Sequence, residues 1–310
     1  PTCGRTLAEF GADVIKIERP GTGDPARRTA PFVHDEPHPD KSLLFLYLNT
    51  NKKSVTLDLK ADTGREILRR LVRWADVLVE SFRPRVMPSL GLDYEALREL
   101  NRRLVMVSIS NFGQTGPYRD YEATDMVQYA LGGLMYVIGS NGREPLKHAL
   151  NQAQFKAGTN AAVAAAIAVF HQQLTGRGQM VDISIQESIT AALRDTTSLY
   201  TYLGAIKRRH PDSVGDMPRS PVEVQDGFIV PVAYGGVDWD MMADFLDAPE
   251  LAEERFSTPQ GRLDNAREMD AILSEALGRW EKEELTRASR RRKGLIFGAV
   301  QSPADLYENP

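Results

Sequence analysis

The sequence predicts an α/β protein with a large unit of alternating helices and strands followed by a smaller unit. Two observations carry this prediction: helical and strand-like patterns alternate along the chain as far as Ala192, and the pattern changes after it. The length of 310 residues allows one large or two ordinary domains. Regular alternation favours a mostly parallel sheet with helices on both faces.

Hydrophobic periodicity predicts the elements of the large unit in order. The expected helices cover residues 5–10, 63–74, 94–100, 125–137 and 155–174. The expected strands cover residues 13–18, 54–59, 76–80, 105–109 and 180–185, and residues 42–48 are expected to form a short apolar turn or strand. A helix at residues 196–207 leads into a polar linker at 208–221. The smaller unit then has expected strands at 227–233 and 297–300 and helices at 239–246, 264–277 and 282–292.

Composition narrows the class of protein. The chain is 42% hydrophobic and 26% charged, with a net charge of −4, as in an ordinary soluble protein without a globally basic character. The only cysteine, Cys3, excludes a disulfide framework, and the five histidines lack metal-ligand spacing, so we expect no metal site. Neither a signal peptide nor a run of roughly 20 apolar residues is found, so a cytoplasmic location is expected.

Local motifs are compatible with an anionic ligand but do not require one. Residues 13–24 end a strand in a glycine-rich loop, without the spacing of a dinucleotide or P-loop fingerprint. Five basic residues lie near predicted strand ends, where open α/β sheets bind ligands: Arg27, Arg28, Lys52, Lys53 and Lys60. These charges indicate either a phosphorylated ligand or an ordinary charged surface, and the motifs leave both interpretations open.

Six runs of sequence carry a more specific signal. They are LAEFGADVIKIERPGTGDPAR (7–27), NTNKKSVTLDLK (49–60), ADVLVESFRP (75–84), LGLDYEALRELNRRLVMVSISNFGQTGPY (90–118), DMVQYALGGLM (125–135) and TGRGQMVDISIQES (175–188). In this order they resemble the class III CoA-transferase family, which includes formyl-CoA transferase, carnitine CoA-transferase and the α-methylacyl-CoA racemases. The resemblance covers nearly all of the large unit and is weak from Thr196 onward, until residues 301–306 match again.

The resemblance implies a fold and an assembly. It implies a Rossmann-like large CoA-binding domain at residues 1–195, a linker at 196–222 and a small α/β domain at 223–310. Two ring-shaped subunits of this family interlock into a dimer. The chain opens on Pro1 without an initiator Met and closes at Pro310 as a helix begins. We therefore expect a fragment that lacks an N-terminal strand and a C-terminal return segment.

The resemblance also implies the ligand and its contacts. Coenzyme A or acyl-CoA is expected as a substrate, without a permanently bound cofactor. The positions that match the family's usual CoA contacts are Arg27, Leu57, Lys60, Ser81, Phe82, Ser110, Asn111 and Phe112. Basic side chains suit the phosphates, and a phenyl ring can lie against adenine. Ser89 stands where the family often carries Arg, which removes one expected contact.

The catalytic position departs from the family. Its transferases use an aspartate just before the long helix, which attacks the acyl-CoA thioester as a covalent nucleophile. Aligning on Ala157-Gly158 puts Gln154 at this position, and a neutral amide is a very poor nucleophile. The racemase branch also needs a histidine where Thr124 stands. Gln154 is expected either to cap the helix or to fill the space of the nucleophile and hydrogen-bond a CoA or acyl carbonyl.

Three functions remain compatible with the sequence. In the first, the chain is the non-catalytic subunit of a heteromeric CoA-transferase whose sister subunit keeps the aspartate, as in family members that act on benzylsuccinate. Alternatively, it is an active homodimeric transferase that uses another group, or a CoA-binding protein without transfer activity. The expected partners are an acyl-CoA, a carboxylic acid and a second subunit. The sequence does not identify the acid.

Overall fold

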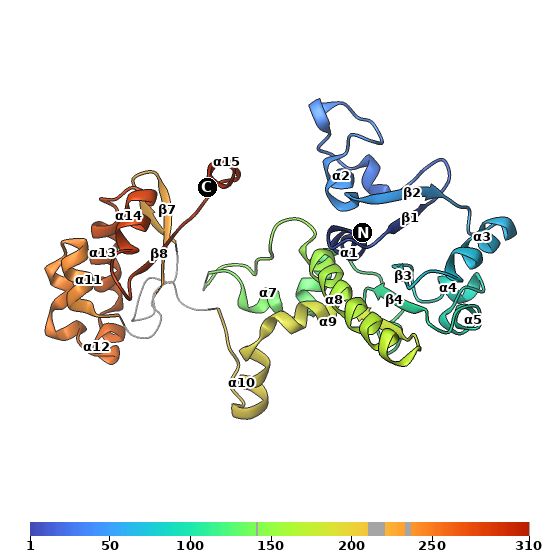
Figure 1. The fold of residues 1–310 in the computed structure, drawn as a ribbon. Coiled ribbons are helices and arrows are strands. Elements are labelled where there is room, and N and C mark those ends of the chain that lie inside the picture. Colours follow the sequence, from blue (N-terminus) through green and yellow to red (C-terminus); the bar gives the residue numbers. More distant parts are fainter. Residues whose placement is uncertain (141, 210–220, 233–236, 310) are drawn as a thin grey trace. The chain divides into compact units, whose positions relative to one another are not determined.

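The computed structural model describes residues 1–140, 142–209, 221–232 and 237–309 (Figure 1). The chain divides into two compact units, Pro1–Ile138 with Pro145–Lys207, and Gly139–Glu144 with Arg208–Pro310. We describe each unit by itself. The predicted linker at 208–221 lies almost wholly outside the described residues.

The first unit contains five parallel strands. β1 (Val14–Glu18) pairs with β2 (Lys52–Thr56), and β4 (Val105–Ser110) lies between β3 (Val77–Glu80) and β5 (Met180–Ser184). The predicted α/β class is confirmed, but the strands form two parallel sheets rather than one. The helices are α1 (Thr2–Glu9), α2 (Leu43–Asn49), α3 (Asp62–Val72), α4 (Val86–Ser89), α5 (Tyr94–Arg98), α6 (Asp125–Leu131), α7 (Leu134–Val137), α8 (Gln152–Thr175), α9 (Ile185–Thr190) and α10 (Asp195–Leu203). Short 3₁₀ turns occupy Pro25–Arg28, Val33–Asp35 and Ala191–Leu193.

The central strand β4 has helices on both faces. Its residues Val105 and Val107 pack in one cluster with the buried alanines of α8, whereas Met106 packs with Leu68 of α3 and Leu97 of α5. Successive side chains of a strand point to opposite faces, so this division follows directly from the sequence of β4. The predicted arrangement of helices on both faces is therefore confirmed for this sheet.

The long helix α8 approaches α1 closely because its buried face consists of small residues. Ala157, Ala161 and Ala165 are fully buried there. A Cβ atom added at Gly158 would lie 2.5 Å from the Cβ of Thr2, so only glycine fits between the two helices. This contact brings the first turn of α8 next to the start of α1.

Three sequence predictions are wrong in detail. Residues 42–48 form helix α2 instead of a turn or strand, because the Ser42 hydroxyl accepts the Phe45 N–H at the helix start. The helix predicted at 125–137 breaks into α6 and α7, since Gly133 adopts a φ of 80° that glycine tolerates. Helix α8 begins at Gln152, with Asn151 as N-cap, so Gln154 lies in its first turn and does not cap it.

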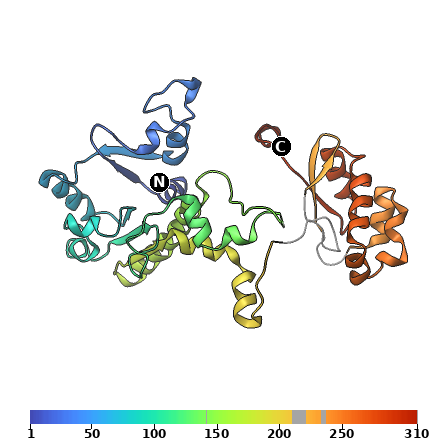
Figure 2. The same ribbon diagram turned by 180° about the vertical axis from the view of Figure 1, so that it is seen from behind.

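The second unit has an antiparallel sheet of β6 (Val222–Val224), β7 (Gly227–Val232) and β8 (Ile296–Ala299). Its helices are α11 (Trp239–Leu246), α12 (Pro259–Asp264), α13 (Ala266–Leu277), α14 (Lys282–Ser289) and α15 (Pro303–Glu308), with 3₁₀ turns at Pro249–Ala252 and Glu254–Phe256. In Figures 1 and 2, helices α11, α13 and α14 lie on one side of the strands. Their apolar faces meet β7 in a core that includes Ile229, Leu251, Phe256 and Leu273. The last residue of the strand predicted at 227–233 lies outside the described residues.

Candidate functional site

A cleft of about 610 Å³ opens in the first unit beyond the carboxyl ends of β3 and β4. In open α/β sheets, ligands bind at this end of the strands. Its walls come from the starts of α1 and α8, the segments after β3 and β4, and a loop before α6. The lining residues are Pro1, Thr2, Cys3, Leu48, Ser81, Phe82, Arg83, Pro84, Arg85, Val86, Ile109, Ser110, Asn111, Arg119, Asp120, Tyr121, Asn151, Gln154, Phe155, Gly158 and Ile185.

The cleft brings together five of the nine residues singled out from the sequence. Ser81 and Phe82 follow β3, Ser110 ends β4 and Asn111 follows it, and Gln154 comes from the first turn of α8. The other four do not line it: Arg27, Leu57, Lys60 and Phe112. Phe112 still lies near, because its ring packs edge-to-face at 6.3 Å from the ring of Tyr121, which does line the cleft.

Arg27 is held away from the cleft by a buried carboxylate. Its Nε and Nη2 each donate to Glu18 at 2.8 Å, and its Nη1 donates to Asp40 at 2.6 Å and to the carbonyl of Pro39 at 3.4 Å. Four of the five guanidinium N–H groups are thus in use. The hydrogen bonds from Arg27 lower the pKa of Glu18 to about 2. This network, the Glu18–Arg27 clamp, fastens the loop after β1 to the strand.

The wall after β3 is held by a second buried carboxylate. Glu80 is 8% exposed and accepts the N–H of Phe82 at 2.8 Å as well as the hydroxyl of Ser108. Gln114 donates its amide to the same hydroxyl at 2.7 Å, so Ser108 uses its own proton toward Glu80. Burial raises the pKa of Glu80. These bonds fix the position of Phe82 at the cleft.

The first turn of α8 rests on the carboxylate of Asp125, which is 8% exposed. Asp125 Oδ1 accepts the N–H of Ala153 at 2.8 Å, and Lys147 Nζ lies 3.0 Å from Oδ2. The surrounding groups assign the orientation of the Gln154 amide. Its nitrogen donates to Asp125 Oδ1 at 2.7 Å and to the carbonyl of Asn151 at 3.2 Å. We refer to these contacts as the Asp125–Gln154 network.

Two further side chains that line the cleft, Cys3 and Asp120, are poorly suited as nucleophiles, since Cys3 is protonated and both oxygens of the ionised Asp120 accept from arginines. Burial raises the pKa of Cys3 to about 11, so its sulfur stays a protonated thiol at neutral pH. Asp120 is the single carboxylate among the lining residues. It pairs with Arg85 at 2.7 Å and with Arg119 at 2.9 Å, and these hydrogen bonds hold its pKa well below the usual range.

Sequence reasoning missed the basic residues of the cleft. Arg83 and Arg85 follow Phe82, and their side chains are 75% and 76% exposed. Arg119 and Tyr121 join them from the loop before α6. The signal was present in the run SFRPR, where two arginines follow a predicted strand end. Within the described residues, no three His, Cys, Asp or Glu side chains group in a way that could hold a metal ion. No helix in that part of the chain is both long and apolar enough to cross a membrane.

Comparison with known proteins identifies the class. The model of CoA-transferase family III matches residues 1–310, so the chain belongs to this family, and the resemblance seen in the sequence is confirmed. Among solved structures, a CAIB/BAIF family protein from Brucella suis is 32% identical, with a TM-score of 0.86 over 100% of this chain and 82% of that one.

Curated relatives of the chain include CoA-transferases. The succinyl-CoA–D-citramalate CoA-transferase of Chloroflexus aurantiacus is 32% identical over 313 residues, which cover 100% of this chain and 77% of that protein. Subunit BbsE of the succinyl-CoA:(R)-benzylsuccinate CoA-transferase of Thauera aromatica is 39% identical over 246 residues, which cover 79% of this chain and 59% of that subunit. Relatives therefore include both proteins named as whole enzymes and proteins named as subunits.

Proposed function

We propose that the chain binds an acyl-CoA in the cleft and acts as the non-catalytic subunit of a heteromeric CoA-transferase that moves CoA between carboxylic acids. The observation that carries this proposal is Gln154, an amide in the cleft at the position that the resemblance assigns to the family's nucleophile. Among the residues lining the cleft, the carboxylate of Asp120 is paired twice with arginines, and Cys3 is a thiol. The cleft thus offers a binding surface but lacks an activated carboxylate.

The cleft suits the CoA part of an acyl-CoA. Exposed arginines at 83 and 85 match the charge of its phosphates, since guanidinium groups bind phosphate oxygens well. Phe82 is 43% exposed and can lie against the adenine ring. Ser110 and Asn111 add polar contacts in the same cleft. Arg27, by contrast, serves the fold in this proposal, because Glu18 and Asp40 already occupy its donors.

The sister subunit supplies the nucleophilic carboxylate. In the chemistry that the resemblance implies, this carboxylate attacks the thioester carbonyl, forms a mixed anhydride and releases CoA thiolate. The thiolate then attacks the enzyme's acyl carbon and releases the first acid, which leaves an enzyme–CoA thioester. The acceptor carboxylate attacks the enzyme carbonyl of that thioester, forms a second mixed anhydride and releases CoA thiolate. The thiolate then attacks the acceptor's carbonyl carbon, which forms the new acyl-CoA and releases the enzyme carboxylate. The present chain would bind and orient CoA next to this sequence of steps.

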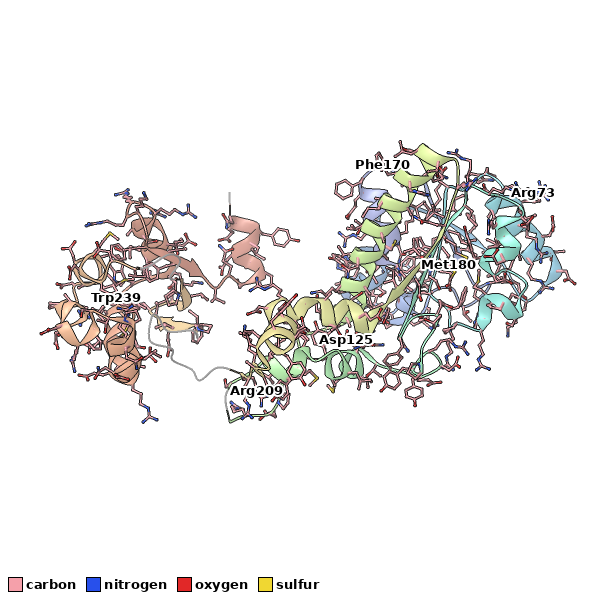
Figure 3. All side chains as sticks on the ribbon, turned by 90° about the horizontal axis from the view of Figure 1, so that it is seen from below. Arg73, Asp125, Phe170, Met180, Arg209 and Trp239 are labelled. Carbon is pink, nitrogen blue, oxygen red and sulfur yellow. The ribbon has the colours of Figure 1, made fainter. Side chains whose placement is uncertain are left out.

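An exposed apolar stripe on α8 fits a partner subunit. Val163, Ile167, Phe170 and Leu174 recur at intervals of four, three and four residues, with exposures of 57%, 63%, 62% and 71%. Phe170 projects from the outer side of α8 in Figure 3. Large exposed apolar patches mark interaction sites. Relatives named as subunits include BbsE and the alpha subunit of the succinyl-CoA–L-malate CoA-transferase of Chloroflexus aurantiacus.

Native mass spectrometry of the full-length protein from its own cells tests the proposal. We expect an assembly of two different, related subunits, one of which carries an aspartate at the position of Gln154. The isolated full-length chain should bind coenzyme A without catalysing transfer, and addition of the sister subunit should produce transfer. A homodimer that catalyses transfer alone would contradict the proposal and favour an active enzyme with a different nucleophile.

A further inference from the structure

We propose that Asp125 is a positioning residue that fixes the Gln154 amide, so that Gln154 presents only its carbonyl oxygen to the cleft and receives a hydrogen bond from an uncharged donor of the ligand. The assignment of that ligand as a coenzyme A derivative rests on the proposed function. The assignment of the amide orientation rests on the geometry alone.

The amide has no hydrogen left for a ligand. A glutamine NH₂ group carries two N–H donors, and here one contact goes to Asp125 Oδ1 at 2.7 Å and the other to the Asn151 carbonyl at 3.2 Å. If the amide turned over, its oxygen would face these two acceptors. An uncompensated contact of this kind is unfavourable because acceptor oxygens repel each other. The orientation is therefore selected by the protein before any ligand arrives.

Asp125 can impose this orientation because it is itself fixed. The carboxylate is more than nine-tenths buried, and it accepts the N–H of Ala153 at 2.8 Å, which belongs to the same helical turn as Gln154. Lys147 forms an ion pair at 3.0 Å with its other oxygen, which accepts no hydrogen bond among the described residues, and the Lys147 ammonium donates to the carbonyls of His148 and Leu150. A short, charge-assisted bond from Gln154 to such a carboxylate is stronger than a neutral one.

This orientation determines what the cleft can recognise at Gln154. The expectation that Gln154 hydrogen-bonds a CoA or acyl carbonyl requires a free N–H and does not fit. A carboxylate ligand is also disfavoured there, because it would meet a carbonyl oxygen with the Asp125 charge behind it. The Ser110 hydroxyl, which is buried, lines the cleft and lacks a hydrogen-bond partner among the described residues, can instead donate to a ligand carbonyl.

Coenzyme A offers several uncharged donors: the amide N–H groups and the hydroxyl of its pantetheine arm, the ribose 2′-hydroxyl, the adenine amino group and the S–H group of the free thiol. Acetyl-CoA has the amide groups but no S–H group. Comparing the two ligands therefore distinguishes the thiol from the donors that both ligands share. In either case the recognised chemistry at Gln154 is the same.

The first test uses the ligand-free, full-length protein labelled with ¹⁵N-glutamine. The side-chain NH₂ resonance of Gln154 is identified by its loss in Gln154→Leu. Because both protons are hydrogen-bonded, we expect them to exchange with water more slowly than those of Gln173, an exposed glutamine near the other end of α8. Exchange should accelerate in Asp125→Asn. Equal exchange at Gln154 and Gln173 would overturn the proposal, whatever the protein binds.

The second test is calorimetric titration with coenzyme A and with acetyl-CoA. Gln154→Leu should weaken binding about tenfold, because a ligand donor is left without its acceptor. The matched change is Gln173→Leu on the same helix. It should leave the affinity within about twofold of the original, because Gln173 is exposed and lies outside the cleft. A loss for both ligands identifies a donor that acetyl-CoA retains, such as a pantetheine amide or hydroxyl, and a loss for coenzyme A alone identifies the thiol.

A double-mutant comparison separates positioning from a merely structural role. In Asp125→Asn, the Gln154→Leu change should lose most of its effect on affinity, since the amide is no longer held in one orientation. An undiminished tenfold effect would contradict the role of Asp125. Unchanged affinity in Gln154→Leu for both ligands would contradict the ligand contact. A protected Gln154 amide in a protein that binds neither ligand would contradict the proposed function while supporting the positioning.

Discussion

Two polar networks of the first unit make opposite use of their hydrogen-bonding groups. In the Glu18–Arg27 clamp, four guanidinium N–H groups of Arg27 are bound by Glu18, Asp40 and Pro39, and the ring of Phe45 covers the guanidinium at 3.7 Å. In the Asp125–Gln154 network, the amide nitrogen is equally occupied, and in our proposal the carbonyl oxygen of Gln154 is left to accept a hydrogen bond from a ligand in the cleft. The sequence singled out both residues as ligand contacts.

The difference indicates how a binding residue can be recognised from its unused hydrogen-bonding capacity. A side chain such as Arg27, with four of its five donors engaged by the protein, stabilises the fold, whatever its charge suggests. A side chain that is held rigidly on one side and open on the other is prepared for a ligand, because little conformational entropy remains to be lost on binding. The predictions below test this distinction, from the largest expected effect to the smallest.

Breaking the clamp should cost stability rather than ligand affinity. Arg27→Ala leaves the buried carboxylate of Glu18 without its cation, and we expect the free energy of unfolding to fall by about 3 kcal/mol. Urea denaturation measures this loss, and titration with coenzyme A should show affinity within about twofold of the original. The neighbouring Arg28→Ala removes an exposed arginine of the same turn and should change stability by less than about 0.5 kcal/mol.

The opposite result would reverse the assignment. If Arg27→Ala weakened coenzyme A binding at least tenfold and left stability unchanged, then Arg27 would be the phosphate contact that the resemblance predicts. The clamp would then have to open when the ligand binds.

The same clamp predicts a pH dependence of stability. Arg27 lowers the pKa of Glu18 to about 2 in the folded protein, whereas an unfolded glutamate has a pKa of about 4.3. The stabilisation is therefore complete above about pH 4.3 and is lost as the pH falls from there toward 2. Urea denaturation across this range should show a smaller acid-induced loss in Glu18→Gln than in the original protein. Parallel pH profiles for the two proteins would contradict a role for Glu18 in this loss.

The sequence predicted the parts of the fold that depend on local patterns. The alternation in β4 specified its two helix-covered faces, and the small residues from Ala157 to Ala168 specified the buried face of α8. It missed helix α2, because a short apolar run has no periodicity that separates helix from strand. The sequence also could not show that the guanidinium group of Arg27 is hydrogen-bonded within the protein. Its acceptor Asp40 lies 13 positions away, and Glu18 is reached only once the loop folds back. Gln154 was found through the resemblance, but its orientation depends on Asp125, 28 to 29 positions earlier in the chain.

The exposed arginines of the cleft should behave as ligand contacts. Arg83 is 75% exposed, and its only ion pair among the described residues is with Glu122, so it can turn toward a phosphate at little cost. We expect Arg83→Gln to weaken coenzyme A binding about fivefold, with a smaller effect at high salt because screening reduces exposed charge interactions. Arg98→Gln is the matched control, as an exposed arginine of α5 paired with Glu95 outside the cleft. Equal effects of the two changes would indicate that Arg83 acts only through net charge.

Restoring an aspartate at position 154 should have the smallest effect, and it addresses the Asp125–Gln154 network most directly. In Gln154→Asp the new carboxylate faces Asp125 without an amide hydrogen between them, and like charges at this distance raise the pKa of the new group. Its ionised, nucleophilic form should therefore be scarce at neutral pH and increase at higher pH.

We expect no transfer near pH 7 and a small amount of enzyme–CoA thioester, detected by intact mass after incubation with an acyl-CoA, at pH 8 to 9. The double change Gln154→Asp with Asp125→Asn removes the repulsion and should give more thioester than the single change at neutral pH. Full transfer by Gln154→Asp alone at pH 7 would contradict this expectation. It would mean that Asp125 does not suppress the new carboxylate and that the site lacks only its nucleophile.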